Sequence, residues 1–170
     1  LTTTVLALLL PISASAGQCP WKVAELEGEV ASAAERVEDA WADTRRKDKE
    51  IARLRRLAIL DCQESGAEQK LSAFVVVAPG FDIAAAVQKA ELLSVCIDEK
   101  HAEGQSRLAD ARATRNRTLE RRLLTVISDI DGFRPRVLDH QISVNQLASK
   151  VGRLAEEREN LLTTCSAGAF

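Results

Sequence analysis

The sequence is poor in the side chains that fill a wide globular core. Its 170 residues include no Met and no Tyr, and aromatic residues make up only 4%. Alanine and the branched aliphatic residues must therefore supply most of the buried surface. Charged residues make up 28%. We therefore expect an elongated structure with a thin apolar seam rather than a wide core.

Sequence patterns of common catalytic and cofactor sites are also absent. The chain has no G-x-S-x-G, no H-E-x-x-H, no phosphate-binding glycine loop and no dinucleotide fingerprint. Asp129, Asp131 and Gly132 lack the spacing and the distal Glu of a calcium loop. His101 and His140 are interpreted as surface or seam residues, and a zinc site with the cysteines is disfavoured because no C-x-x-C occurs. We expect a non-enzymatic protein without catalytic residues, cofactor or metal.

The charge is nearly balanced, with 23 basic and 25 acidic residues. This balance argues against a nucleic-acid partner. Two basic runs nevertheless stand out: Arg45, Arg46, Lys47, Lys49, Arg53, Arg55 and Arg56, and then Arg107, Arg112, Arg115, Arg117, Arg121 and Arg122. A solvated helix face is the simpler interpretation, and a docking stripe for an anionic partner is the alternative. In the second run, Arg112, Arg115 and Arg122 are candidate partner-binding residues.

Residues 1–16 resemble a secretory leader. An apolar stretch from Val5 to Leu10 precedes Pro11, and Ala14 and Ala16 form an A-x-A cleavage pattern. We expect cleavage after Ala16, and a sequence that begins inside its own leader because no basic n-region precedes it. The apolar stretch is too short for a comfortable membrane span. Export to the extracellular space or cell surface is predicted, with the periplasm as the alternative, and a missing C-terminal anchor would add membrane association.

Aliphatic residues recur at the spacing of three and four residues that buries one helix against another. Two such seams are Val23, Leu26, Val30, Ala33, Val37 and Ala40, and Val137, Val144, Leu147, Val151, Leu154 and Leu161. The pattern predicts an all-α protein, an elongated antiparallel helical hairpin or three-helix bundle with coiled-coil-like packing. A single domain is expected over residues 17–165, with helices at about 20–63, 82–131 and 135–164 and a loose end at 166–170. Thr44 and Lys47 fall on the first seam, where packing should loosen.

Residues 71–81 differ from their surroundings because they carry no charge and combine three valines with Pro79 and Gly80. We predict that the chain doubles back here. Phe74, Val75, Val76, Val77 and Phe81 form either an apolar plug at the bundle end or an exposed tip that binds a partner. A second break is predicted at Gly132–Pro135, because proline disfavours a helical conformation in the residue before it.

The four cysteines indicate disulfides in an oxidising compartment. A hairpin about Pro79 places Cys62 level with Cys96, each 17 residues away. We therefore predict a Cys62–Cys96 bridge. Cys19 and Cys165 lie at opposite ends of that arrangement, which leaves bridges to another chain, a packed thiol, or a direct pair.

Asn116-Arg117-Thr118 is an N-glycosylation acceptor, predicted to lie midway along the second helix. A leader, a cysteine just inside the mature chain, a long alanine-rich helical hairpin and this asparagine together resemble the layout of variant surface glycoproteins, the helical coat proteins of trypanosomes. The resemblance covers residues 1–165 and concerns layout. It implies a glycosylated, GPI-anchored, dimeric ectodomain, with general roles for Cys19, Cys62, Cys96 and Asn116. The chain departs from the family in being short and arginine-rich and in showing no anchor signal.

The sequence thus predicts a non-enzymatic, exported or cell-surface helical protein with a structural or interaction role. A surface-coat ectodomain is one form of it, and a bacterial periplasmic or phage envelope-associated spacer is the alternative. The expected partner is another protein or a second copy of the chain.

Overall fold

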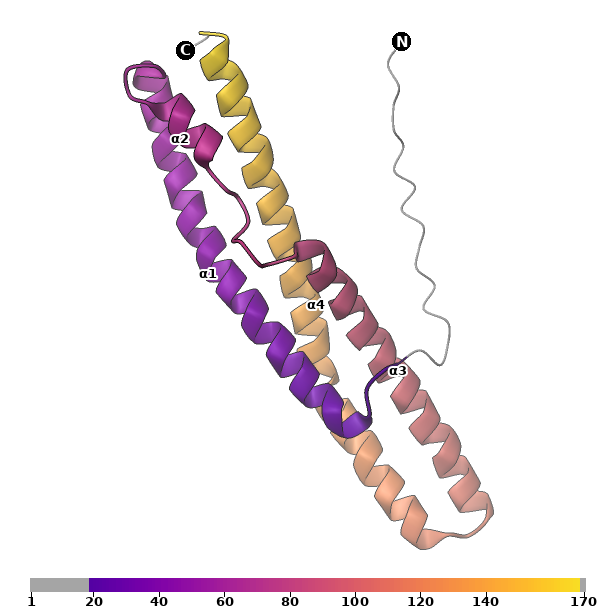
Figure 1. Cartoon of the computed structure of the whole chain (residues 1–170). Coiled ribbons are helices and arrows are strands. Elements are labelled where there is room, and N and C mark those ends of the chain that lie inside the picture. The colour runs from indigo at the N-terminus through magenta and orange to yellow at the C-terminus, as the bar shows by residue number, and fades with distance from the viewer. Residues whose placement is uncertain (1–18, 169–170) are drawn as a thin grey trace, which may run out of the picture.

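The computed structural model describes residues 19–168 and is all-α over that range (Figure 1). Its helices are α1 (Val23–Asp61), α2 (Ala67–Ala73), α3 (Ile83–Ala113) and α4 (Arg117–Ser166). The predicted helical bundle is therefore confirmed, and α1 matches the first expected helix closely. The expected leader and the last two residues lie outside the described part of the chain.

The helices α1 and α4 run side by side in the same direction (Figure 1). Three polar contacts join them, each linking residues 102 positions apart and each one heptad from the next: Trp41–Ser143 (3.0 Å), Lys150–Asp48 (2.6 Å) and Arg55–Glu157. A constant offset with a seven-residue step is the geometry of a parallel coiled coil. The predicted seams lie between these helices, with Leu26, Val30, Val144 and Leu147 all buried.

The helices α3 and α4 form an antiparallel hairpin. Three polar contacts across the two helices are centred on residue 116: the ion pairs Asp98–Arg134 (3.3 Å) and Arg112–Glu120 (2.9 Å), and the contact between His101 and Asp131 (3.3 Å). The chain reverses at Thr114–Asn116, where Arg115 takes a φ of 57° and the Asn116 side chain accepts a hydrogen bond from the Leu119 N–H. Asn116 is thus the N-cap of α4. The expectation that it lies midway along a helix is wrong.

The predicted break at Gly132–Pro135 is also wrong, because α4 continues through Pro135. A proline inside a helix costs about 3 kcal/mol through its missing N–H and its clash with the preceding turn. Pro135 lies on the exposed face of α4, whereas Ile130, Phe133 and Val137 are buried on the other face. Burial of such side chains stabilises by about 1.5–3 kcal/mol each, which outweighs the local penalty.

The reversal between α1 and α3 occurs earlier than predicted. The ion pair between Lys89 and Glu29 (2.7 Å) is centred on residue 59, about 20 positions before Pro79. After α1 the chain turns at Gly66, which has a φ of 66°, and then runs back along α1 as α2 and an extended segment over 74–82 (Figure 1). This return segment lies along the part of α1 where the prediction had placed the second helix.

The shifted register changes the disulfides. Cys96 is bonded to Cys19, with Cα atoms 5.1 Å apart, and Cys62 is bonded to Cys165, with Cα atoms 5.6 Å apart. The predicted Cys62–Cys96 bridge is therefore wrong. Cys96 lies beside the beginning of α1 and Cys62 beside its end, and a helix of that length separates them by roughly 60 Å at 1.5 Å per residue. Both bridges lie within one chain, and each ties α1 to a different helix.

The core is a series of small apolar clusters along the bundle rather than one wide centre. The α3–α4 hairpin is packed tightly at Gly104, where an added Cβ would meet the Ile127 side chain at 3.0 Å. Thr44 lies buried on the seam as predicted and donates its hydroxyl hydrogen to the Ala40 carbonyl over 2.8 Å. The hairpin end, which holds Gly104 and Ile127, extends beyond the first residue of α1 (Figure 1).

Candidate functional sites at the three-helix junction and the hairpin end

The uncharged segment between α2 and α3 lies along the side of the bundle rather than at its end (Figure 1). Phe74 is 8% exposed and packs into the cluster beneath α2, and Phe81 packs against the central cluster. The Lys47 ammonium lies 6.0 Å from the centre of the Phe74 ring and donates a hydrogen bond to the Val75 carbonyl. Burial of Phe74 and partial burial of Phe81 favour a packing role for the two rings over an exposed tip.

The remaining members of this segment differ in exposure. Val75 is 57% exposed, whereas Val76 and Val77 are partly buried. Val75 alone therefore offers a broad apolar surface here, and partner binding by the segment stays a prediction.

The second basic run lies at the end of the α3–α4 hairpin. Arg107 pairs with Glu103 (3.8 Å) and Arg112 with Glu120 (2.9 Å). The other four arginines are exposed and form no ion pair within the described part of the chain: Arg115, Arg117, Arg121 and Arg122. Folding thus brings the predicted candidates Arg112, Arg115 and Arg122 to one projecting end. We call this surface, Arg107–Arg122, the arginine end.

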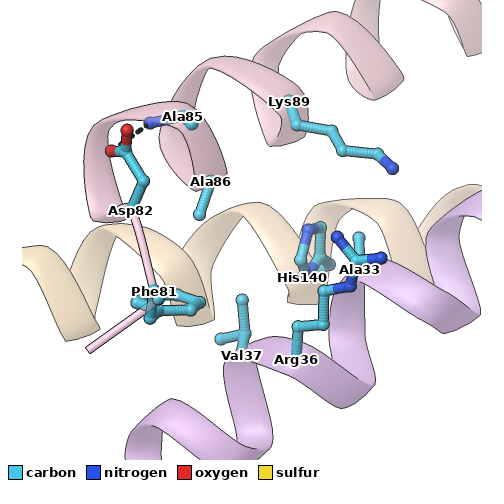
Figure 2. Close-up of a pocket in the computed structure, with 10 residues that line it drawn as sticks. Ala33, Arg36, Val37, Phe81, Asp82, Ala85, Ala86, Lys89 and His140 are labelled. Carbon is cyan, nitrogen blue, oxygen red and sulfur yellow. Dashed lines mark hydrogen bonds between the residues drawn. The ribbon is translucent and has the colours of Figure 1, made fainter. Parts of the chain in front are cut away.

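A second candidate site is a cavity of about 230 Å³ where α1, α3 and α4 meet (Figure 2). Its apolar lining comes from the three segments that converge there: Ala33 and Val37 of α1, Phe81 before α3, and Ala85 and Ala86 of α3. Its basic and polar lining consists of Arg36, Lys89 and His140, with Asp82 at the N-cap of α3. We call it the junction cavity.

His140 is the unusual member of this lining. It is 5% exposed, and neither ring nitrogen has a hydrogen-bond partner among the described residues. Burial lowers the pKa of His140 below its usual 6.5, and the positive charge of Lys89 lowers this pKa further. At neutral pH the imidazole is therefore uncharged, with one N–H to donate and one nitrogen to accept.

The two cations of the junction cavity differ in how far they are neutralised. Lys89 donates to the Glu29 carboxylate over 2.7 Å, and its ammonium lies 5.7 Å from the centre of the Trp21 ring. Arg36 is exposed and forms no ion pair in the described part of the chain. The carboxylate of Asp82 accepts a hydrogen bond from the Ala85 N–H over 3.0 Å, drawn dashed in Figure 2. Arg36 therefore supplies the uncompensated positive charge.

The residues weighed for a zinc site do not come together. His101 lies beside Asp131 on the hairpin, and Cys62, Cys96 and Cys165 are all in disulfides. Within residues 19–168 no group of three or more His, Cys, Asp or Glu side chains is placed to hold a metal ion.

The sequence contained one signal for the junction cavity. His140 follows Val137 by three residues and precedes Val144 by four, so it occupies a core position of the seam. A histidine at that position is buried when the seam packs against another helix. Periodicity identifies that position but does not show that Arg36 of α1 and Lys89 of α3 lie beside it, because that depends on how three helices pair.

Comparison with known proteins leaves these sites without a precedent: no protein-family model, curated protein or solved structure matches the chain. Among the described helices, none has a stretch both long enough and apolar enough to cross a membrane.

Proposed function

We propose that this chain is an exported, non-enzymatic helical interaction protein that docks through the arginine end onto an acidic surface of a partner protein. The observation that carries the proposal is a group of four exposed arginines at the projecting end of the α3–α4 hairpin, none of which has an ion-pair partner among residues 19–168. Unpaired arginines are suited to carboxylate partners because the planar guanidinium donates two parallel hydrogen bonds.

The charge at this end is local. Residues 107–122 contain six arginines but only Asp110 and Glu120 as acidic residues, although the whole chain has a net charge of −2. Glu120 is already paired with Arg112. The other basic run, at Arg45–Arg56, is more fully compensated, because four of its cations form ion pairs: Arg45, Arg46, Lys47 and Arg55. The positive potential that steers association is therefore concentrated at the arginine end. This locality favours docking at one end over general attraction to polyanions.

Export is supported by the cysteines. All four are paired in the structure, and such bridges persist in oxidising compartments outside the cytosol. Together with the leader-like residues 1–16, they support an extracellular or cell-surface location, with the periplasm as the alternative. The parallel α1–α4 ladder and the two bridges make the bundle a suitable rigid support for a docking end.

A surface-coat ectodomain is the second candidate. Asn116 lies in the exposed turn of the hairpin, where a glycosyltransferase would reach it. The two candidates are separable because a glycan at Asn116 would stand among the arginines and block a protein partner. A glycosylated Asn116 therefore favours the coat protein, and an unmodified one leaves the docking end free.

The test compares two variants that lose the same number of charges. The first replaces Arg115, Arg117, Arg121 and Arg122 with Gln, and the control replaces Arg45, Arg46, Arg53 and Arg56 of α1. Fluorescence anisotropy with a labelled poly-glutamate peptide measures binding of an acidic polypeptide. We expect the first variant to bind about tenfold more weakly, since exposed charge pairs contribute about 0.2–1 kcal/mol each and four of them together reach the roughly 1.4 kcal/mol of a tenfold change. The control should bind like the wild type.

Equal weakening in both variants would contradict a docking end and indicate unspecific charge attraction. Heparin and vesicles rich in phosphatidylserine serve as competing probes. Preference for either over poly-glutamate would overturn the protein-partner proposal in favour of a glycan or a membrane surface.

A further inference from the structure

We propose that the junction cavity binds a small organic monocarboxylate, with the carboxylate between Arg36 and His140 and an apolar body against Val37, Phe81 and Ala86. This site is separate from the arginine end, and the inference does not depend on the proposed function.

The first argument is the unpaired histidine. Buried polar groups nearly always have hydrogen-bond partners, and leaving one unpaired costs about 1–3 kcal/mol. The His140 side chain lines the cavity and is only 5% exposed, and neither of its ring nitrogens has a hydrogen-bond partner among residues 19–168. An aliphatic residue at this seam position would avoid that cost. A ligand that accepts the imidazole N–H removes it.

The second argument is size. The junction cavity measures about 230 Å³, whereas one water molecule occupies about 30 Å³ in the liquid. A single bridging water therefore would not fill it. Pockets for drug-sized ligands begin at about 300 Å³. The volume fits a molecule about the size of benzoate.

The third argument is charge. Lys89 is already neutralised by Glu29, whereas Arg36 at the solvent rim has no ion-pair partner among the residues that the structure describes. The Asp82 carboxylate at the other rim repels a second negative charge. One available cation and one opposing carboxylate favour a singly charged anion over a phosphate. The remaining lining is apolar, which favours a hydrocarbon body.

The orientation of the ligand follows from these positions. Figure 2 draws Arg36 from α1 and His140 from α4 at one side of the cavity, and Phe81 and Asp82 at the other. A carboxylate beside Arg36 accepts hydrogen bonds from the guanidinium and from the imidazole N–H, while an apolar ring or chain extends toward Phe81. This arrangement also keeps the ligand's charge away from Asp82.

Binding is coupled to protonation of His140. The charged residues that line the cavity with this ring are Arg36 of α1, and Asp82 and Lys89 at the beginning of α3, and Lys89 is paired with Glu29 of α1. A bound carboxylate adds a negative charge beside the imidazole and raises its pKa. Benzoate should therefore bind more tightly as the pH falls toward 5.5, because it remains ionised there.

The test uses the histidine resonances of the intact, disulfide-bonded protein. The chain has two histidines, and His101 beside Asp131 lies on the hairpin outside the cavity. NMR titration with benzoate to about 10 mM, where a ligand of millimolar Kd is mostly bound, should shift the His140 ring signals saturably and leave His101 unchanged. The pKa of His140 should rise when benzoate is present.

Two variants and one neutral analogue sharpen the test. Arg36→Gln should weaken benzoate binding about tenfold, the equivalent of one charge-assisted hydrogen bond. Arg53→Gln is the matched control because Arg53 is exposed on the same helix and does not line the cavity. Benzamide has the same ring without the charge and should not saturate the site.

Three outcomes would overturn the inference. Benzoate that leaves the His140 signals unmoved means that no carboxylate enters, as when water alone occupies the cavity. Benzamide that binds as well as benzoate means an apolar cavity without a role for Arg36. Equal affinity in wild type and Arg36→Gln rejects the assigned carboxylate position.

Discussion

At the scale of single residues, His140 is where a local stability cost is concentrated. It lies on a seam whose neighbouring positions are the aliphatic residues Val137 and Val144, and its ring nitrogens have no hydrogen-bond partner in the described part of the chain. The residue is tolerated because the neutral imidazole carries no net charge and has nearly the volume of a leucine side chain. Its protonated form is not tolerated equally, because burial and Lys89 both oppose a positive charge there.

The pH dependence of stability should reveal this cost. Because the folded-state pKa of His140 is lowered below 6.5, the unfolded chain binds more protons there, and this residue's contribution to stability falls as the pH drops below about 6.5. His140→Leu should be about 1 kcal/mol more stable than wild type at pH 7, since it removes unpaired buried nitrogens. Its advantage should grow from pH 7 to pH 5.

Urea unfolding followed by circular dichroism at several pH values measures this difference. His101→Gln is the control, because His101 is more exposed and lies beside Asp131. A wild type and a His140→Leu variant whose stabilities fall in parallel with pH would show that His140 does not titrate in this window.

At the scale of elements, two residues of α4 have local sequence signals that differ from the structure they adopt around the α3–α4 turn. Pro135 indicates a helix break but lies within α4, and Asn116 reads as a glycan acceptor but caps the helix. Local propensities amount to about 1–3 kcal/mol at such positions. Burial of Ile130, Phe133 and Val137 along a continuous α4 exceeds this.

Paired substitutions distinguish the two turn positions. Pro135→Ala should stabilise the protein by about 1–3 kcal/mol, because alanine restores a helical N–H and removes the clash. Asn116→Ala should destabilise it by about 1 kcal/mol through loss of the N-cap. Thermal and urea unfolding measure both changes. If the chain turned at Pro135 instead, the alanine there would bring no gain and Asn116→Ala would be neutral or stabilising.

At the scale of the whole molecule, the disulfides hold α1 against the hairpin at two distant levels. Cys19–Cys96 joins residues 77 positions apart, and Cys62–Cys165 joins residues 103 positions apart. Cross-links over separations of this size restrict the unfolded chain strongly. The hairpin of α3 and α4 has its own packing around Gly104, so α1 is the element that most depends on these bridges.

Removal of either bridge should lower the free energy of unfolding by about 2–5 kcal/mol. The variants are Cys19→Ser with Cys96→Ser, and Cys62→Ser with Cys165→Ser, compared by urea unfolding. A non-reducing peptide map of the wild type should recover Cys19 with Cys96 and Cys62 with Cys165. Recovery of Cys62 linked to Cys96 would restore the hairpin about Pro79 and contradict the α1–α3 register.

Several features were predictable because they depend on neighbours within a turn or two. The 3–4 spacing identified the buried faces of α1 and of the second half of α4, and the predicted start of the second helix at about residue 82 agrees with Asp82 as the N-cap of α3. The unexpected α2 shows the limit of this approach. Its seven residues are too few for a periodic signal, and its formation depends on packing of Ala67 and Leu71 against α1 and α4.

The amino-acid sequence by itself determined that the chain is helical, which faces are apolar and which residues are basic, because each follows from side-chain type and helical period. Tertiary structure alone decided the register, since heptad seams pair equally well at several offsets. That register set the disulfide partners, brought the arginines to a projecting hairpin end and placed Arg36 and Lys89 around His140. The reason is energetic: burial summed over three long interfaces outweighs any single local preference.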